Sequence, residues 1–266
     1  MSERLFSNQD SGVTIWNHRR LPLYKTHAFD FFRCVAFKPE FYNKTVSELH
    51  TGNLRVSRAD NRYSNLFPGQ RLSYWADSPQ TARAEAKKWG AKNNLLLFWA
   101  YDDCSSLFPT VYPPQEMKII DGMQLSFNRI LKNLERKEQL TVKDWELIDQ
   151  IADEEPDCLV YESEARKGSL NFLFFEHGFR KLSLREVRLR LGDEKGKNHN
   201  KIVCAKADSY TPYIGNYGDM FLPIAKIKRD DKYVDSDEYR LRWDVVLTRV
   251  TRMVEEYRDQ STEFIE

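Results

Sequence analysis

The chain has 266 residues, of which 41 are Lys or Arg and 40 are Asp or Glu, so its formal net charge is only +1. This balance provides no global field toward nucleic acid or an anionic membrane, and it argues against a dedicated nucleic-acid-binding protein. The four cysteines form no CxxC pair and the five histidines show no ligand spacing, so we expect neither a metal site nor a disulfide framework.

No membrane segment or secretory leader is evident in the sequence. Residues 1–10 are polar, and no stretch approaches the roughly 18 consecutive apolar residues that a membrane helix needs. Together with the scattered cysteines, this pattern predicts a soluble protein of the reducing cytoplasm.

The first predicted elements follow a polar N-terminal segment. Residues 2–26 carry few periodic apolar positions, so we expect an arm that wraps the core before regular structure begins. A strand is predicted at residues 31–37. Residues 52–69 are rich in Asn, Ser, Arg and Gly and should form loop and turn, and a strand should follow at Leu72–Ala76.

A short helix comes next and has the clearest boundaries in the sequence. Ser78 can cap it, Pro79 suits its first position, and Gly90 supplies a stop just past Trp89. We therefore expect this helix to begin and end sharply.

Beyond this helix, strand-length apolar runs alternate with helical patterns. A strand is predicted at Leu95–Tyr101, and three prolines then require a loop around residues 109–114. Helical patterns follow at residues 122–137 and 142–151, the second with Thr141 as its cap. The two helices should form a hairpin over one face of the protein.

Short strands and a final helix complete the chain. Four more strands are predicted at residues 158–161, 170–175, 186–191 and 201–205. Residues 192–200 should form an exposed hairpin tip, and residues 209–219 a loop rich in Tyr and Gly. Apolar residues at helical spacing predict a C-terminal helix of about five turns: Trp243, Val246, Leu247, Val250, Val254 and Tyr257. Its apolar stripe either packs on the protein's own core or mediates a homodimer or the docking of an inhibitor.

These elements predict an α+β fold in which a mixed, multi-stranded sheet carries peripheral helices and a C-terminal helix. No internal repeat or low-complexity segment interrupts the sequence. We expect residues 1–266 to form a single elaborated domain, in which residues 206–266 are an extension that contains the long helix.

The short helix carries a carboxylate on its apolar face. Ala82, Glu85, Ala86 and Trp89 fall at i, i+3, i+4 and i+7, so they share one side of the helix. A buried, ionised carboxylate needs a nearby cation or a strong set of hydrogen-bond donors. The loop arginines Arg55, Arg58 and Arg62 offer such a cation. Alternatively, Glu85 lies at the margin of this face and reaches water.

The same segment carries a motif. Residues 74–85 read Tyr-Trp-Ala-Asp-Ser-Pro-Gln-Thr-Ala-Arg-Ala-Glu, which resembles the Tyr-x-Ala-x-Ser-x-x-Thr-Ala-x-x-Glu segment of RES-domain proteins at every fixed position. Upstream, Phe32-Arg33 resembles the family's early arginine, and residues 61–64 resemble its Gly-Arg-aromatic-Asn turn. Downstream, residues 159–175 are similar to its strand-Ser-x-Arg-x-Gly-Asn-apolar run. Asn61, Ser64 and Glu162 depart from the family pattern.

The resemblance spans residues 31–175 and implies an ADP-ribosyltransferase-like core over residues 27–205. RES proteins are the toxin halves of bacterial toxin–antitoxin pairs and consume NAD⁺ by phosphorolysis or hydrolysis, and some transfer ADP-ribose to a protein. The resemblance therefore implies NAD⁺ as substrate with phosphate or water as acceptor, no metal, and an antitoxin-like protein as a partner.

It also implies a set of site residues. Breaking the nicotinamide–ribose bond develops positive charge on the ribose, which a fixed carboxylate can stabilise. We expect the catalytic residues to be Glu85, Tyr74 and Arg62. The residues expected to bind NAD⁺ are Arg33, Arg62, Tyr63, Tyr74 and Ser163, with the arginines on the pyrophosphate.

Each of these residues also has a purely structural interpretation. Tyr74 can simply pack in its strand, Arg33 can lie on the solvated face of an edge strand, and Ser163 can bond a turn. At the level of function, two alternatives stay open: a protein ADP-ribosyltransferase that uses NAD⁺, and a catalytically silent nucleotide-binding module.

Overall fold

The computed structural model describes residues 12–17, 22–27, 30–46, 49, 62–101, 117–179, 181–192, 199–206, 226–230, 232–242, 244, 248 and 252. The strands are β1 (Gly12–Asn17), β2 (Pro22–His27), β3 (Asp30–Ala36), β4 (Leu72–Ala76), β5 (Leu95–Tyr101), β6 (Met117–Asp121), β7 (Cys158–Glu162), β8 (Leu170–Phe175), β9 (Ser183–Gly192) and β10 (His199–Lys206). The helices are α3 (Arg62–Leu66), α4 (Pro79–Lys88), α5 (Phe127–Glu135), α6 (Val142–Asp153) and α7 (Glu176–Phe179), with 3₁₀ turns at Pro39–Phe41 and Tyr233–Asp235.

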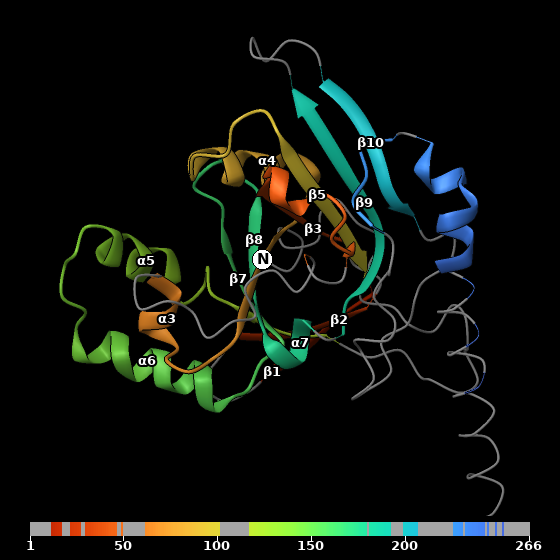
Figure 1. The fold of residues 1–266 in the computed structure, drawn as a ribbon. Helices are drawn as coiled ribbons and strands as arrows, with labels where there is room; N and C mark the ends of the chain where they lie inside the picture. Colours follow the sequence, from red (N-terminus) through yellow and green to blue (C-terminus); the bar gives the residue numbers. More distant parts are fainter. Residues whose placement is uncertain are drawn as a thin grey trace, which may run out of the picture.

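The strands form one mixed sheet in the order β1-β2-β6-β7-β8-β4-β3-β5-β9-β10. β6 and β7 run parallel, while the other neighbours are antiparallel. Figure 1 shows the long β9–β10 hairpin at one end of this sheet. The predicted α+β class with a mixed sheet is confirmed.

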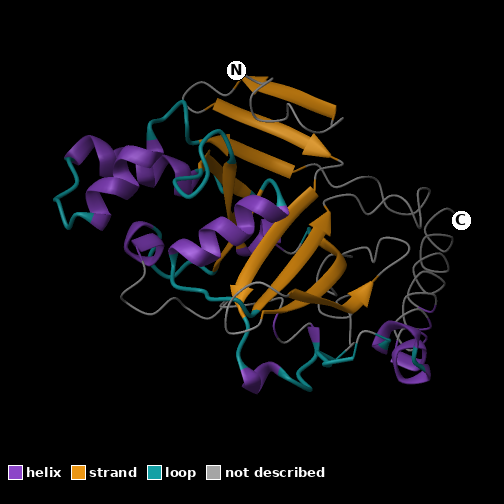
Figure 2. Cartoon of the chain, turned by 90° about the horizontal axis from the view of Figure 1, so that it is seen from above, coloured by secondary structure: helices purple, strands orange, loops and turns teal. Residues whose placement is uncertain are grey.

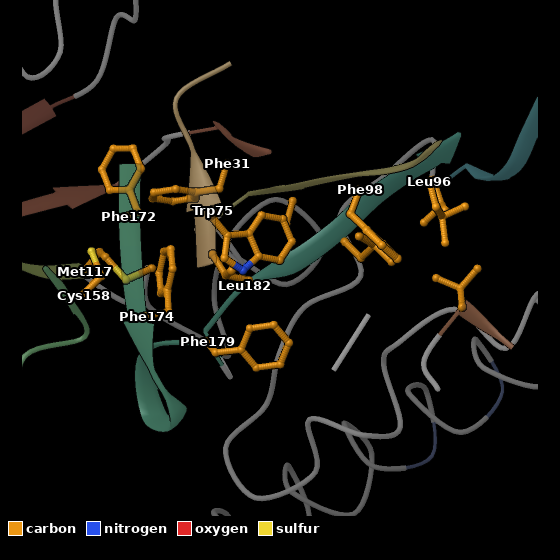
Figure 3. Close-up of a cluster of buried hydrophobic side chains, with 14 of the residues drawn as sticks. Phe31, Trp75, Leu96, Phe98, Met117, Cys158, Phe172, Phe174, Phe179 and Leu182 are labelled. Carbon is orange, nitrogen blue, oxygen red and sulfur yellow. The ribbon is translucent and has the colours of Figure 1, made fainter. Parts of the chain in front are cut away.

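One face of the sheet buries a cluster of aromatic side chains. Phe31 meets Phe172 and Phe174 edge to face, with ring centroids 5.1 and 5.0 Å apart. Trp75 packs beside them, as Figure 3 shows. Each such side chain contributes roughly 1.5–3 kcal/mol by leaving water. Alternation along each strand directs these residues to one side and their chain neighbours to the other.

On the opposite face, α3, α5 and α6 cover part of the sheet. Figures 1 and 2 show them as a group apart from α4. Their buried side chains pack against those of the central strands: Leu66, Phe127, Ile130, Ile148, Ile151, Leu159 and Leu173. Thr141 and Asp144 form a complete capping box at the start of α6, and Arg129 pairs with Asp144. The predicted helical hairpin is therefore confirmed.

The short helix α4 has the predicted boundaries. The Ser78 hydroxyl accepts a hydrogen bond from the Thr81 amide at 3.2 Å, and Pro79 occupies the first turn. Gly90 follows the helix with φ of +89°, a conformation that glycine adopts without steric cost. The burial prediction was wrong for one residue, since Trp89 is 58% exposed.

The N-terminal prediction was wrong. An arm without regular structure was expected over residues 2–26, yet β1 and β2 lie there as an antiparallel hairpin. β2 pairs with β6, and no strand was predicted at the residues of β6 either. Backbone pairing at the end of a sheet needs no periodic apolar pattern, so hydrophobicity could not reveal this hairpin.

Two helical segments also differ from expectation. The loop predicted for residues 52–69 includes α3, a short helix that buries Tyr63 and Leu66 in the second cluster. α5 begins five residues later than predicted, because Asp121 accepts hydrogen bonds from the amides of Met123 and Gln124 and holds a turn there. In both places, tertiary and turn contacts outweigh local periodicity.

Other predictions lie partly or wholly outside the described residues: the proline loop, the hairpin tip between β9 and β10, and the loop over 209–219. Residues 237–242, 244, 248 and 252 are helical, but the apolar stripe of the C-terminal helix is not described. Ile227, Tyr233 and Tyr239 of the extension belong to the aromatic cluster. In the described part of the chain, every helix is too short or too polar to cross a membrane.

Candidate functional site

Glu85 is buried on α4, with only 4% of its surface exposed. The cap at Ser78 fixes the start of the helix and thereby the direction in which each side chain points. Thr81, Ala82 and Glu85 are its buried residues. The interpretation in which Glu85 reaches water is wrong, and the inward-facing interpretation is confirmed.

Three donors converge on one oxygen of this carboxylate. The Ser163 hydroxyl donates to Oε1 at 2.6 Å and the Asn171 amide group donates to it at 2.8 Å. The backbone amide of Ala165 adds a longer contact of 3.5 Å. Such a donor set satisfies a buried carboxylate oxygen. The described residues donate no hydrogen bond to Oε2, so the second oxygen is available to a ligand.

The donors belong to the β7–β8 hairpin: Ser163 and Ala165 lie in its turn, and Asn171 lies in β8. The Ser163 amide bonds the Ser169 carbonyl at 2.8 Å, which closes the turn. Ser163 also accepts from the Arg166 amide at 3.2 Å, so the hydroxyl is held from both sides. An exposed ion pair of 2.6 Å between Lys88 and Glu164 ties the same turn to α4. Two separate parts of the chain thus fix the position of Glu85.

A cavity of about 310 Å³ lies beneath α4, between the helix and the strands β3 and β4. Glu85 lines it, as do Phe32, Cys34, Tyr74 and Trp89. β3 and β4 are paired only at Phe32 and Ala76, so these neighbouring strands share one registered pair where the helix crosses them. A volume of this size falls within the roughly 300–1,000 Å³ typical of small-molecule sites.

Tyr74 lies on the face of the sheet that α4 covers, and it lines the cavity together with Glu85. Its ring is part of a group of three tyrosines, 6.1 Å from the ring of Tyr63 and 6.4 Å from that of Tyr161. The hydroxyls of Tyr63 and Tyr161 share a short hydrogen bond. In the strand register, Tyr161 is directly opposite Asn171, which donates to Glu85. The group of three tyrosines therefore lies next to the donors around Glu85.

Arg33 is one of the β3 residues that line the cavity, but its guanidinium is directed elsewhere. Its guanidinium donates to the Ser73 hydroxyl at 2.6 Å, and the Trp75 indole donates to the same oxygen at 2.9 Å. Strand alternation puts these three residues on the face of the aromatic cluster, opposite Tyr74. Burial lowers the pKa of Arg33 to about 10, which leaves the group charged at neutral pH. The structure therefore does not bring the Arg33 guanidinium to Glu85.

The other predicted cations cannot be placed beside Glu85. Arg55 and Arg58 lie outside the described residues. Arg62 is the first residue of α3, and its side chain is not described. Of the two ways to satisfy a buried carboxylate, a neutral donor set is therefore the one that the described residues provide.

The structure thus brings together Glu85, Tyr74, Tyr63 and Ser163, and it adds two residues to which the sequence analysis gave no role. Asn171 lies in the matched Gly-Asn-apolar run, which was the signal for it. Tyr161 precedes Ser163 by two positions on the same strand face, and alternation could have identified it. Comparison of the sequence with protein-family models and with curated proteins gave no match.

Proposed function

We propose that this protein degrades NAD⁺ by cleaving the bond between nicotinamide and ribose, with phosphate or water as the acceptor, on an ADP-ribosyltransferase-like core. The observation that supports the proposal most directly is the buried Glu85 in the cavity wall, held through Oε1 while Oε2 is available to a ligand. The motif at residues 74–85 supplies the choice of substrate.

The chemistry needs a fixed negative charge more than a strong nucleophile. When the C1′–N bond breaks, its electron pair stays with nicotinamide and positive charge develops on the ribose. Glu85 stabilises that charge, and an oxygen of phosphate or water then bonds to C1′; an attacking water releases a proton to solvent. Because Ser163 and Asn171 already orient the carboxylate, little reorganisation is needed during the reaction.

The surrounding residues provide the rest of the site. Tyr74 presents an aromatic ring to the cavity, where it can pack against the flat nicotinamide. The rings of Tyr63 and Tyr161 lie beside that ring, with centroids 6.1 and 6.4 Å from its centroid. Ser163 acts through Glu85 and is therefore a positioning residue. This role replaces the direct contact with phosphate or nicotinamide that was expected for it.

The test is nicotinamide release from NAD⁺ by the purified full chain, with and without phosphate, for wild type and for Glu85→Gln. The variant keeps the size of the side chain and one oxygen that can accept from Ser163 and Asn171, but it removes the charge, so release should fall at least about 100-fold. Glu138→Gln is the matched control. It changes an exposed carboxylate just after α5 that, among the described residues, has no contact with the site, and release should stay within about twofold of wild type.

The products separate the alternatives. ADP-ribose phosphorylated at this same C1′ identifies phosphorolysis, and free ADP-ribose identifies hydrolysis. Label that passes from radiolabelled NAD⁺ to protein identifies the ADP-ribosyltransferase alternative. NAD⁺ that binds without nicotinamide release identifies a silent binding module and overturns the proposal. Circular dichroism of Glu85→Gln verifies that a loss of release does not come from unfolding.

A further inference from the structure

Two basic residues lie on the flank of α4 that points away from Glu85. Arg83 precedes Glu85 by two residues, so it projects about 200° around the helix from it. Lys87 lies one turn after Arg83 on the same flank. α4 packs against β3, β4 and β5, so this flank lies over the part of the sheet that continues toward β9.

Arg190 approaches the same place from β9. Ala36 of β3 is registered with Leu95 of β5, and Leu95 is registered with Arg190. Directly opposed residues share a face of the sheet, so Arg190 lies on the same face as Ala36 and Cys34. Both of these residues line the cavity beneath α4. Arg83 and Arg190, which we call the arginine pair, therefore meet beside the cavity.

The described residues give the arginine pair no acidic partner, although arginines in proteins commonly have one. In the described part of the chain, Arg83 and Arg190 form no ion pair, and the Nε of Arg190 is buried without a hydrogen-bond acceptor. Arg188 provides the contrast on the same strand face, because its Nη2 donates to Oε2 of Glu186 at 3.0 Å. Two half-buried guanidinium groups to which the described residues offer no acceptor form a site of uncompensated positive charge.

The electrostatics around Cys34 agree with this arrangement. Burial lowers the pKa of Arg83, and the charge of Arg190 lowers it further. Burial also raises the pKa of the Cys34 thiol to about 12, against the opposite effect of the neighbouring cations. Cys34 is therefore a neutral thiol at physiological pH, so it does not balance the charge of the two arginines.

We propose that Arg83 and Arg190 bind a phosphate group at the edge of the cavity beneath α4. A guanidinium donates two parallel hydrogen bonds to phosphate oxygens, and two guanidinium groups match the charge of a dianion. The phosphate group belongs either to free phosphate or to the diphosphate of a nucleotide. This inference concerns anion binding, and it holds whether or not Glu85 cleaves NAD⁺.

Calorimetric titration of the full chain with sodium pyrophosphate, at constant ionic strength set by NaCl, tests the proposal. Wild type should bind, and Arg83→Gln and Arg190→Gln should each weaken the affinity about tenfold or more. Arg188→Gln removes a similar charge from the same strand face and should change the affinity less than twofold. Equal affinity in wild type and either arginine variant overturns the proposal. A loss of affinity in Arg188→Gln as large as in the two arginine variants also overturns it.

Thermal unfolding guards against a variant that merely misfolds. In buffer without multivalent anions, the two arginine variants should unfold at or above the wild-type midpoint, because each removes a repelling charge. Phosphate should raise the midpoint of wild type more than that of either variant. A variant that melts well below wild type and still binds pyrophosphate normally overturns the site.

Competition identifies the source of the phosphate. If ADP-ribose and inorganic phosphate exclude one another, the arginine pair takes the diphosphate of the nucleotide. If both bind together, it takes free phosphate, and each result supports the site. Glu85→Gln should keep pyrophosphate binding, so a failure of NAD⁺ cleavage and a failure of anion binding are distinguishable.

Discussion

The hydroxyl of Ser163 donates a 2.6 Å hydrogen bond to Oε1 of Glu85, across 78 positions of sequence and between two different elements. The bond joins the turn after β7 to the middle of α4, and the turn is itself closed by its own backbone bonds. The orientation of the carboxylate is thus a property of the tertiary fold, and the local helix alone does not determine it.

Replacing Ser163 with Ala should therefore impair catalysis more than substrate binding. Oε1 loses one of its two short donors, and the resulting misorientation should lower kcat about tenfold while KM changes little. Steady-state nicotinamide release measures both constants. Ser163→Thr keeps the hydroxyl and should recover most of kcat. A rise in KM with an unchanged kcat would show that Ser163 contacts substrate directly.

Asn171→Asp should place a second carboxylate against Glu85. The amide donates to Oε1 at 2.8 Å in a buried setting, so the variant brings two acidic groups together there. Like charges raise the pKa of one of the pair in the folded state. The free energy of unfolding of the variant should thus be closest to that of wild type at low pH. As pH rises, it should fall by about 3 kcal/mol relative to wild type.

Urea unfolding at pH 5 and pH 8 measures this difference. Asn65→Asp is the matched control, because Asn65 is exposed on α3, and its stability should depend on pH as wild type does. A constant difference between wild type and Asn171→Asp at both pH values would contradict the proximity of the two carboxylates.

Much of the fold near the site could be predicted from local patterns. The cap at Ser78, the proline after it and the glycine stop are short-range signals, and they fixed α4 correctly. Apolar runs likewise identified β3, β4, β5 and β8. These elements carry Glu85 and Tyr74, so the position of both along the chain was predictable.

Other features depend on contacts between distant residues and could not be predicted in this way. Arg33 was assigned to the Glu85 site because it lies early in the motif order, but strand alternation directs it to Ser73 on the other face. A one-residue difference along a strand reverses the direction of a side chain. The donor role of Asn171 requires knowledge of how β8 and α4 pack, which spacing does not encode.

The hydrogen bond between Tyr63 and Tyr161 should appear as a coupling energy. Both residues are buried, so Tyr63→Phe and Tyr161→Phe each leave a hydroxyl without its partner. We expect each single variant to lose about 1 kcal/mol of unfolding free energy and the double variant to lose less than the sum. Urea unfolding of the four proteins gives the coupling, and additive losses would contradict the bond.

Cys34 should make the protein less stable at alkaline pH. Its pKa is about 12 in the folded state, against an ordinary value of 9.0, because burial disfavours the thiolate. A group with a raised folded pKa supports the fold fully below the ordinary value and loses that support as pH rises toward the folded value. Between about pH 9 and pH 12, burial of this thiol should therefore lower the free energy of unfolding by about 1 kcal/mol per pH unit.

Because Tyr and Lys titrate over the same range, the informative quantity is the difference in unfolding free energy between wild type and Cys34→Ala. Below pH 8 this difference should be constant, and above pH 9 it should shift in favour of Cys34→Ala. The native thiol should also react with iodoacetamide at pH 8 far more slowly than the thiol of the urea-unfolded chain, since little thiolate is present. Rapid native alkylation of Cys34, located by peptide mass analysis, would show that the surrounding cations outweigh burial, and it would then make Cys34 a counter-charge for the arginine pair.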